Sequence, residues 1–418
     1  MNVNDCLLII YPALWLFLTF YKAVLYKGDE FSPSMWNREQ VKLLQGVSCV
    51  GVILHHLTQM ITSYGSVKHG PITIFSSMGI LFTSVFFFST GFGLITSVYN
   101  NPDYLKTFLR HRLSIVLIPF FTANTIYTLL RIYYKGIAMS KMDIARSVLG
   151  LVLLNGNGWY IVEVVYLYLI FYILFRLIKK KDIALVLLCV ATIVMIRYAL
   201  VLGHDYSDIG DVHFHGEWWY NSTIVFVMGI IFARFKNGIV STLKKNYKII
   251  VILTALLFVV AFVIEEKILV THGYYRESYV GQKVSDAFIT LVAQMVLCLF
   301  STFLVLLINM KISIGNKVVK GLSVISTELF LIHQVFVSVI FNFSKVDPFY
   351  IYAVVLLCSI PAAIIVHFIN KPLILLFQDK SILRRLLTKR NKMIIAAIAI
   401  LIMIFVALRG LRVLLFML

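Results

Sequence analysis

Apolar runs of about the length needed to cross a bilayer, some 20 residues, recur along almost the whole chain. Of its 418 residues, 60% are hydrophobic and 14% are charged, and its mean hydropathy is +0.91, which excludes a soluble globular protein. The pattern predicts an all-α, polytopic membrane helix bundle with about 12 transmembrane helices. The predicted spans are residues 6–22, 41–60, 72–98, 113–131, 159–176, 183–202, 218–234, 248–265, 286–309, 323–343, 349–369 and 393–416.

Short connections join these runs, the longest being residues 132–158 and 370–392, so any chemistry is expected at or inside the membrane. The net charge of +19 does not indicate nucleic acid as a partner, because the basic residues alternate between loops. Loops after the odd-numbered runs hold most of them and are therefore predicted to be cytosolic. This orientation predicts a multi-pass protein of the cell membrane with both termini outside, whose basic segment 384–392 contacts anionic lipids.

The segment Lys42–Thr58 is apolar enough to span the bilayer, yet it contains two histidines near one end. A histidine at membrane depth is costly and marks a candidate functional site. Gln45 and His56 are separated by steps of four, three and four residues through Cys49 and Val52, so all four share one helix face. The alternative is a packing helix whose histidines lie at the water interface.

The five cysteines lie in apolar runs and form no Cys-x-x-Cys pair, so packing is the expected role of each and no disulfide framework is expected. Residues 203–217 carry three histidines and four acidic side chains, a composition that invites a metal interpretation. A solvated acidic outer loop is the favoured interpretation, and no metal is expected.

Five segments together resemble the acyltransferase-3 family of integral membrane O-acyltransferases. QGVSCVGVILHH and SVFFFSTGFGL are similar to an early Arg-Gly helix that ends in histidine and to a Phe-Phe-x-x-Ser-Gly-Phe signature. LRHRLSIVLIP resembles the family's basic run before a proline-containing helix. STELFLIHQ resembles a late helix that ends in Leu-x-His, and GWYIVEVVYLY resembles a segment that opens on Trp-Tyr. In the order given, these five segments are residues Gln45–His56, Ser84–Leu94, Leu109–Pro119, Ser326–Gln334 and Gly158–Tyr168.

The resemblance covers residues 41–370, which it implies are a ten-helix acyltransferase core. Residues 1–40 would add a transmembrane helix and a cytosolic linker, and residues 371–418 a basic cytosolic segment and a last helix. Gln45 stands where the family carries arginine, and Ile115 is apolar where a second basic residue is usual. Glutamine keeps hydrogen-bond donors but loses the fixed charge and the bidentate fork.

The family resemblance implies transfer of an acyl group, expected to be acetyl, from cytosolic acyl-coenzyme A to a hydroxyl of a glycan or glycolipid outside the cell. His56 matches the family histidine and is expected to act as general base or as transient acyl carrier. Gln45 and His333 complete the candidate catalytic set, with a structural hydrogen bond as the alternative role of His333. Acetyl-coenzyme A, or another acyl-coenzyme A, is thus the expected co-substrate.

Cationic side chains before the span at 113–131 are candidates for binding the phosphates of the donor, since arginine binds phosphate through two parallel hydrogen bonds. They are Arg112, Arg110 and Lys106, expected in a cytosolic loop. The aromatic and acidic residues that open the span at 159–176 are candidates for binding the acceptor, namely Trp159, Tyr160 and Glu163. Topology control, interface anchoring and structural hydrogen bonding are the alternative roles of these residues.

Two other functions stay open from the sequence. A transporter or flippase of an envelope saccharide or lipid would suit the number of helices, although no inverted repeat is visible. A catalytically inactive relative of the acyltransferases would explain the departures at Gln45 and Ile115. Assembly into a homo-oligomer is equally open.

Overall fold

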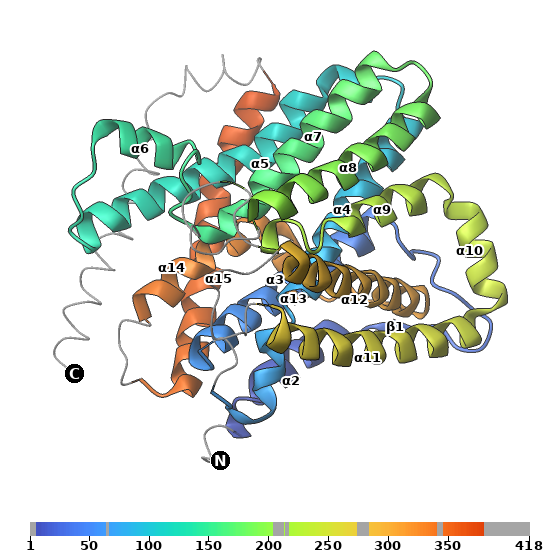
Figure 1. Cartoon of the computed structure of the whole chain (residues 1–418), viewed down its shortest axis with the longest axis horizontal. Coiled ribbons are helices and arrows are strands. Elements are labelled where there is room, and N and C mark those ends of the chain that lie inside the picture. Colours follow the sequence, from blue (N-terminus) through green and yellow to red (C-terminus); the bar gives the residue numbers. More distant parts are fainter. Residues whose placement is uncertain are drawn as a thin grey trace.

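The computed structural model describes residues 6–63, 67–203, 213, 217–273, 284–340 and 346–379. Within these ranges, eight helices are long and apolar enough to cross a membrane, which confirms the expected all-α, polytopic bundle (Figure 1). They are α3 (Arg38–Ile61), α4 (Gly79–Asn100), α5 (Tyr104–Leu129), α7 (Trp159–Leu177), α8 (Lys181–Gly203), α11 (Tyr247–Thr271), α12 (Val284–Lys311) and α15 (Pro348–Gln378).

Two further spans are broken into bent pairs. The pair α9 (Ile224–Arg234) and α10 (Lys236–Lys245) bends by 90°, and the pair α13 (Lys317–Val324) and α14 (Ser326–Ile340) bends by 80°. Counting each pair as one span gives ten spans in the described part of the chain. The expected count of about 12 is therefore not confirmed.

The first predicted span, residues 6–22, is much shorter than expected. It contains α2 (Ile10–Phe20), which has 11 residues and so reaches only about 16 Å, roughly half the apolar thickness of a bilayer. Lys22 then adopts a left-handed backbone with φ of 57°, which a continuing helix does not tolerate. The last predicted span, 393–416, and the basic segment 384–392 lie outside the described residues.

Short elements connect the spanning helices. Strands β1 (Val24–Leu25) and β2 (Ile312–Ser313) pair antiparallel, which joins the start of the chain to the end of α12. The remaining elements are α6 (Lys141–Val148), the 3-10 helices η1 (Gly70–Ser76), η3 (Gly156–Gly158) and η5 (Glu217–Trp219), and the π-helix η2 (Leu130–Tyr134).

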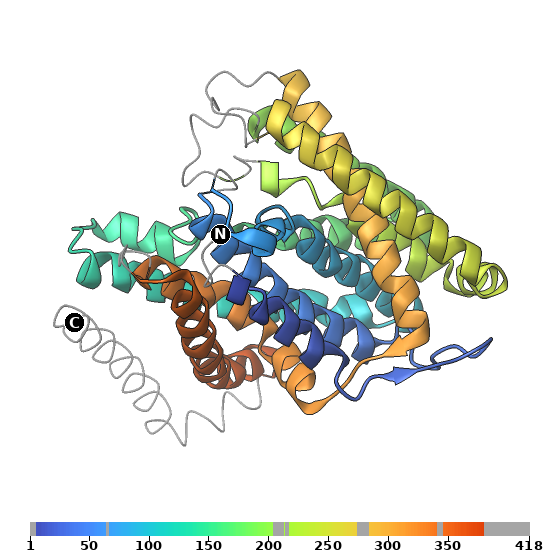
Figure 2. The same ribbon diagram turned by 90° about the horizontal axis from the view of Figure 1, so that it is seen from below.

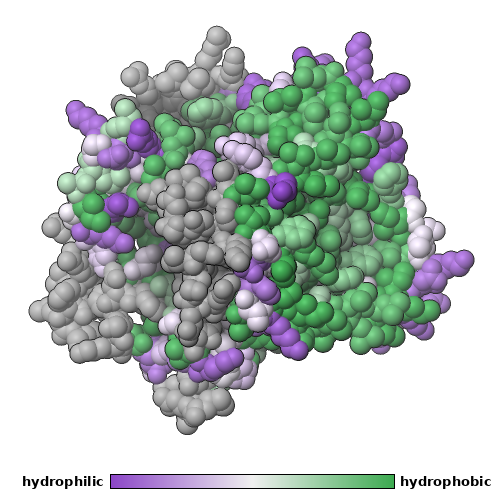
Figure 3. Space-filling model, viewed as in Figure 1, coloured by the Kyte–Doolittle hydropathy of each residue, from purple (hydrophilic) through white to green (hydrophobic). Residues whose placement is uncertain are grey.

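Helix α3 occupies the interior of the bundle, where it packs against α4, α13, α14 and α15. Helices α11 and α12 run side by side as a hairpin at the opposite edge of the molecule from α6 (Figure 1 and Figure 2). Hydrophobic side chains cover much of the coloured surface, and hydrophilic ones lie mainly towards its edges (Figure 3). Exposed apolar side chains include Ile252, Leu256 and Leu357, which only lipid or another apolar phase would solvate.

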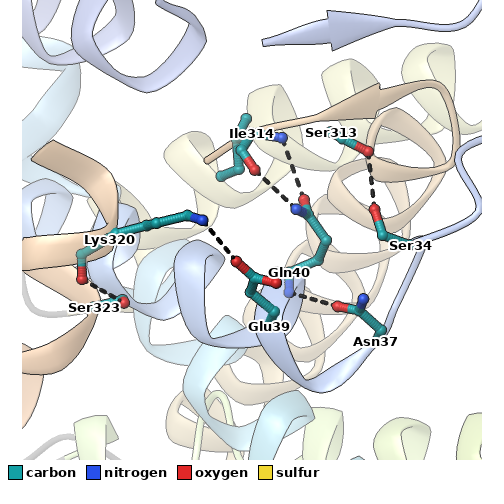
Figure 4. Close-up of polar contacts among 8 residues, drawn as sticks. All are labelled: Ser34, Asn37, Glu39, Gln40, Ser313, Ile314, Lys320 and Ser323. Carbon is teal, nitrogen blue, oxygen red and sulfur yellow. Dashed lines mark hydrogen bonds and ion pairs between the residues drawn. The ribbon is translucent and has the colours of Figure 1, made fainter. Parts of the chain in front are cut away.

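A polar clamp fixes the start of α3 (Figure 4). The Gln40 amide nitrogen donates to the Ile314 carbonyl over 2.8 Å, and the Ile314 backbone nitrogen donates back to the Gln40 oxygen over 3.2 Å. Asn37 caps the helix by accepting from the Gln40 backbone nitrogen over 2.8 Å. Glu39 pairs with Lys320 of α13 over 3.0 Å. These contacts set the position of α3 against α13.

Gly46 allows the backbones of α3 and α13 to touch. A Cβ at this glycine would lie 2.6 Å from the Ser323 nitrogen and 2.8 Å from its Cα, closer than van der Waals contact allows. One turn further on, the Cys49 thiol donates to the Ser326 carbonyl over 3.3 Å, which occupies a backbone group at the break between α13 and α14. Small residues at such contacts are how membrane helices approach closely.

We predict that Gly46→Ala lowers the thermal unfolding temperature of the purified protein in detergent. Overpacking against a backbone that cannot move away costs about 1–3 kcal/mol. Gly93→Ala is the matched control, because Gly93 lies in α4 with no atom within 4 Å of the added Cβ. Alanine favours a helix over glycine by roughly 1 kcal/mol, so Gly93→Ala should be neutral or stabilising. Equal effects of both substitutions would contradict the close α3–α13 approach.

Candidate active site

His56 of α3 and His333 of α14 meet inside the bundle. The His56 Nδ1 atom lies 2.8 Å from the His333 Nε2 atom, and the two rings are nearly parallel at 14° with their centroids 5.1 Å apart. His333 is fully buried, whereas His56 keeps partial exposure. The structure thus brings together two of the three predicted catalytic residues and leaves one of them accessible.

A chain of hydrogen bonds fixes the protons of the two neutral imidazoles. The His333 Nδ1 atom lies 3.1 Å from the Leu329 carbonyl oxygen, which can only accept, so Nδ1 carries the proton. The His333 Nε2 atom is then an acceptor and receives the proton of His56 Nδ1. This leaves the lone pair on Nε2 of His56, the atom that would take a proton from a substrate.

Asparagines before α7 hold the buried histidine. Asn157 Nδ2 lies 3.4 Å from His333 Nε2 and donates to the same acceptor. Asn155 Nδ2 donates to the Leu331 carbonyl over 2.9 Å, and its side-chain oxygen accepts from the Asn157 backbone nitrogen over 3.1 Å. Neither asparagine is among the candidate residues named from the sequence, although the repeated Asn-Gly pairs before Trp159 are a turn signal that places polar side chains there.

His55 has a different environment from its neighbour. Its Nδ1 atom donates to the Phe75 carbonyl over 2.8 Å, and its ring lies directly against Gly79, where no Cβ would fit. The side chain is buried, at 8% exposure. His55 therefore joins α3 to η1 and the start of α4, and His56 is the histidine that faces the site.

Gln45 is not close to the histidine pair. It lies 11 residues before His56, which corresponds to about 16 Å along the helix axis. The two side chains share a helix face, as the spacing predicts, but they lie three turns apart. Gln45 instead lies one residue before Gly46, level with the α13 contact, so a direct role in proton transfer at His56 is excluded by distance.

The three predicted acceptor residues occupy different surroundings at the start of α7. Trp159 is buried against Phe87, and Glu163, with no exposed surface, accepts a hydrogen bond from the Thr223 hydroxyl. Tyr160 is half-buried, and its ring lies 5.6 Å from that of Phe330, which in turn lies 6.3 Å from His333. Only Tyr160 thus borders the histidine site, through one intervening ring.

The predicted donor residues lie within a helix and not in a loop, which corrects that expectation. Helix α5 begins at Tyr104, so Lys106, Arg110 and Arg112 occupy its first three turns. The extension is stabilised by Phe108, which is buried against Phe171 with ring centroids 5.1 Å apart. The long basic stems can extend from such a helix towards water.

Arg112 is the most strongly oriented of these cations. Its Nε atom donates to the Tyr104 hydroxyl over 2.8 Å, and the side chain is half-buried. Arg110 is exposed, and Lys106 forms an exposed ion pair with Asp103 over 2.7 Å. Lys42 of α3 is close enough to Arg112 for their charges to interact, so basic groups from two helices gather here.

Glu328, five residues before His333 in α14, belongs to a separate polar cluster. It accepts from His367 Nδ1 over 3.1 Å and from Asn370 Nδ2 over 3.3 Å. The Asn370 oxygen accepts from the Thr122 hydroxyl over 2.8 Å. These bonds connect α14, α15 and α5, and buried intramembrane polar groups paired in this way hold helices together.

The described residues contain no group of three or more histidine, cysteine, aspartate or glutamate side chains that could hold a metal. Most of the loop 203–217 that invited a metal interpretation lies outside these residues. Within it, His213 is described, and its Nε2 atom lies 2.9 Å from the Gly150 carbonyl oxygen.

Comparison with known proteins gives one match. A family model described as an acyltransferase domain matches residues 38–368, which is most of the chain and includes every candidate site residue. No curated protein and no solved structure matches the chain. The match begins at the first residue of α3 and ends within α15, so α2, β1 and the C-terminal segment lie outside it.

Proposed function

The chain belongs to the acyltransferase-3 family of multi-pass membrane acyltransferases, and from this premise we propose that it is an O-acyltransferase of extracytoplasmic glycans. The donor is an acyl-coenzyme A, acetyl-coenzyme A in the first instance, and the acceptor is a hydroxyl of a cell-envelope glycan or glycolipid. The observation that carries this proposal is the hydrogen-bond chain from Leu329 through His333 to His56.

His56 supplies the base in this reaction. A sugar hydroxyl is a poor nucleophile until a positioned group takes its proton, and the Nε2 lone pair of His56 is available for that proton. The hydroxyl oxygen attacks the thioester carbonyl, the carbon–sulfur bond breaks, and the proton on His56 passes to the departing thiolate. His333 stabilises the charged ring by accepting its Nδ1 proton.

A second route uses the same atom. Nε2 of His56 attacks the thioester carbonyl, the carbon–sulfur bond breaks, and coenzyme A leaves as its thiolate. The acceptor hydroxyl then attacks the acyl-imidazolium. As the carbon–nitrogen bond breaks, the hydroxyl proton passes to Nε2 and from there to the thiolate. Both routes need the His56 tautomer with its proton on Nδ1, which the contact with His333 supports. His56→Ala would remove the reactive atom of both routes. They differ in whether an acyl-imidazole forms before the acceptor binds.

The positions of the charges suggest how the substrates approach. Positive-inside orientation places the starts of α3 and α5 at the cytosol, where Arg112 and Lys42 would hold donor phosphates. His56 lies 14 residues after Lys42, about 21 Å along α3, towards the outer face. The thioester therefore enters from the inside, and the glycan reaches His56 from the outside.

Tyr160 is the residue through which we expect the acceptor to be contacted, because aromatic rings stack on sugars and this ring borders the site through Phe330. Trp159 and Glu163 support it from the buried side of α7. Of the three acceptor residues proposed from the sequence, Tyr160 is therefore the expected contact, and Trp159 and Glu163 are expected to support it.

We predict that His56→Ala lowers acyl transfer by about 10²–10⁴, the usual contribution of a general base. His333→Ala should lower it less, because it removes the acceptor that orients the His56 ring but leaves the reactive Nε2 atom in place. The measurements are the acetyl content of the surface glycan in cells and the release of coenzyme A from acetyl-coenzyme A by purified protein.

His55→Ala is the neighbouring control. It should lower the unfolding temperature through loss of the Phe75 hydrogen bond while leaving the rate per folded molecule much less changed. Unchanged acetylation in a folded His56→Ala protein would reject the proposed chemistry and favour a transporter or an inactive relative.

For Arg112→Ala, the expected result is a higher KM for acyl-coenzyme A with an unchanged KM for the acceptor. Loss of a charge-assisted hydrogen bond to phosphate weakens binding by about 1.5–3 kcal/mol. Lys106→Ala should have a smaller effect, because Lys106 is exposed and paired with Asp103. A fall in kcat alone would show that Arg112 does not anchor the donor.

Orientation is tested by labelling single cysteines in intact cells with an impermeant thiol reagent, on a background lacking the five native cysteines. Lys68→Cys, beyond the far end of α3, should label, and Lys245→Cys, at the end of α10, should not. The opposite pattern would place His56 on the donor side and remove the proposed path across the membrane.

A further inference from the structure

An open cleft of about 440 Å³ lies between α10 and the segment that precedes α3, away from the histidine pair. Polar side chains of α10 line one wall, and Pro33 and Met35 lie opposite. The four polar lining residues are Lys236, Asn237, Ser241 and Lys244. Its volume lies within the range of about 300–1,000 Å³ that is usual for ligand sites.

The bend after α9 produces this arrangement. Helix α9 ends at Arg234, and α10 turns by 90° from it, so α10 lies across the end of a spanning helix. Lys236 and Lys244 are two turns apart on one side of α10, and Asn237 and Ser241 are one turn apart beside them. Leu243, on another side, is buried.

Aromatic rings orient both lysines. The Lys236 ammonium lies 5.7 Å from the centre of the Phe92 ring, and the Lys244 ammonium lies 5.3 Å from that of Phe31. In the described ranges, neither lysine is paired with a carboxylate. The cleft thus presents two positive charges, an amide and a hydroxyl, and no carboxylate lines it.

We propose that this cleft is a binding site for a phosphate group. Two lysines supply point charges for the anion, and the amide and hydroxyl donate hydrogen bonds to its oxygens. An anionic lipid headgroup is the nearer source, since α10 lies across the end of the bundle, and coenzyme A is the other. The site is independent of the proposed acyl transfer, because it contains none of the residues assigned to that reaction.

The test measures binding to the purified full chain in a neutral detergent, with two pairs of probes that differ in phosphate. Phosphatidylglycerol is compared with diacylglycerol, and coenzyme A with pantetheine, which lacks the phosphates. The variants are Lys236→Ala, Lys244→Ala and the double substitution. Lys245→Ala is the matched control, because Lys245 is on the same helix but does not line the cleft.

We expect phosphatidylglycerol binding to weaken roughly fivefold for each lysine removed, corresponding to about 1 kcal/mol per basic residue near anionic lipid. Lys245→Ala should bind as the unchanged protein does, and diacylglycerol should not respond to any substitution. The same lysine dependence for coenzyme A, without one for pantetheine, would support the phosphate site and identify its source as the donor.

Two results would overturn the proposal. One is that phosphatidylglycerol and coenzyme A both bind, and that no substitution in the cleft changes the binding of either. The other is an equal loss in Lys245→Ala, which would indicate a diffuse surface charge effect. Far-UV circular dichroism and size-exclusion chromatography establish that each variant is folded, and Lys236→Gln with Lys244→Gln replaces the alanine pair if that pair misfolds.

Discussion

The close contact of α3 with the break between α13 and α14 is the interaction on which the rest of the structure depends. A break at membrane depth leaves backbone groups without helical partners, and hydrocarbon offers them no hydrogen bonds. Here Gly46 lets α3 approach until its backbone touches Ser323, and Cys49 bonds the Ser326 carbonyl. These two contacts hold α3 against the break, and from Cys49 and Ser326 the helices α3 and α14 run together for two further turns.

That course of α14 is what creates the histidine pair. His333 reaches His56 across 277 sequence positions, and its protons are fixed by the carbonyl of Leu329 in its own helix. Asn155 and Asn157 fasten the same turn from the side of α7. The reactive ring is therefore partly exposed while the groups that orient it are buried, an arrangement that keeps its geometry constant as substrates come and go.

Ten of the predicted runs correspond to the spans and bent pairs of the described residues, because an apolar environment allows few backbone conformations other than a helix. The family resemblance selected His56 over His55, and the structure leaves His56 partly exposed beside His333 and buries His55 against Phe75. Periodicity assigns a residue to a helix face but does not say which helix lies against that face. The family resemblance put His56 and His333 in one candidate set, but the direct contact between them is visible only in the structure. The start of α5 was missed because Lys106, Arg110 and Arg112 interrupt an apolar pattern that Phe108 continues.

The pairing of β1 with β2 has a consequence for how the chain is made. Asn316 bonds the Leu18 carbonyl across 298 sequence positions, and β1 finds its only strand partner among the described residues after α12. Helix α2 can pack early on α3, to which Trp15 donates a hydrogen bond at Val47, but β1 and the Leu18 carbonyl must wait through most of translation for their partners.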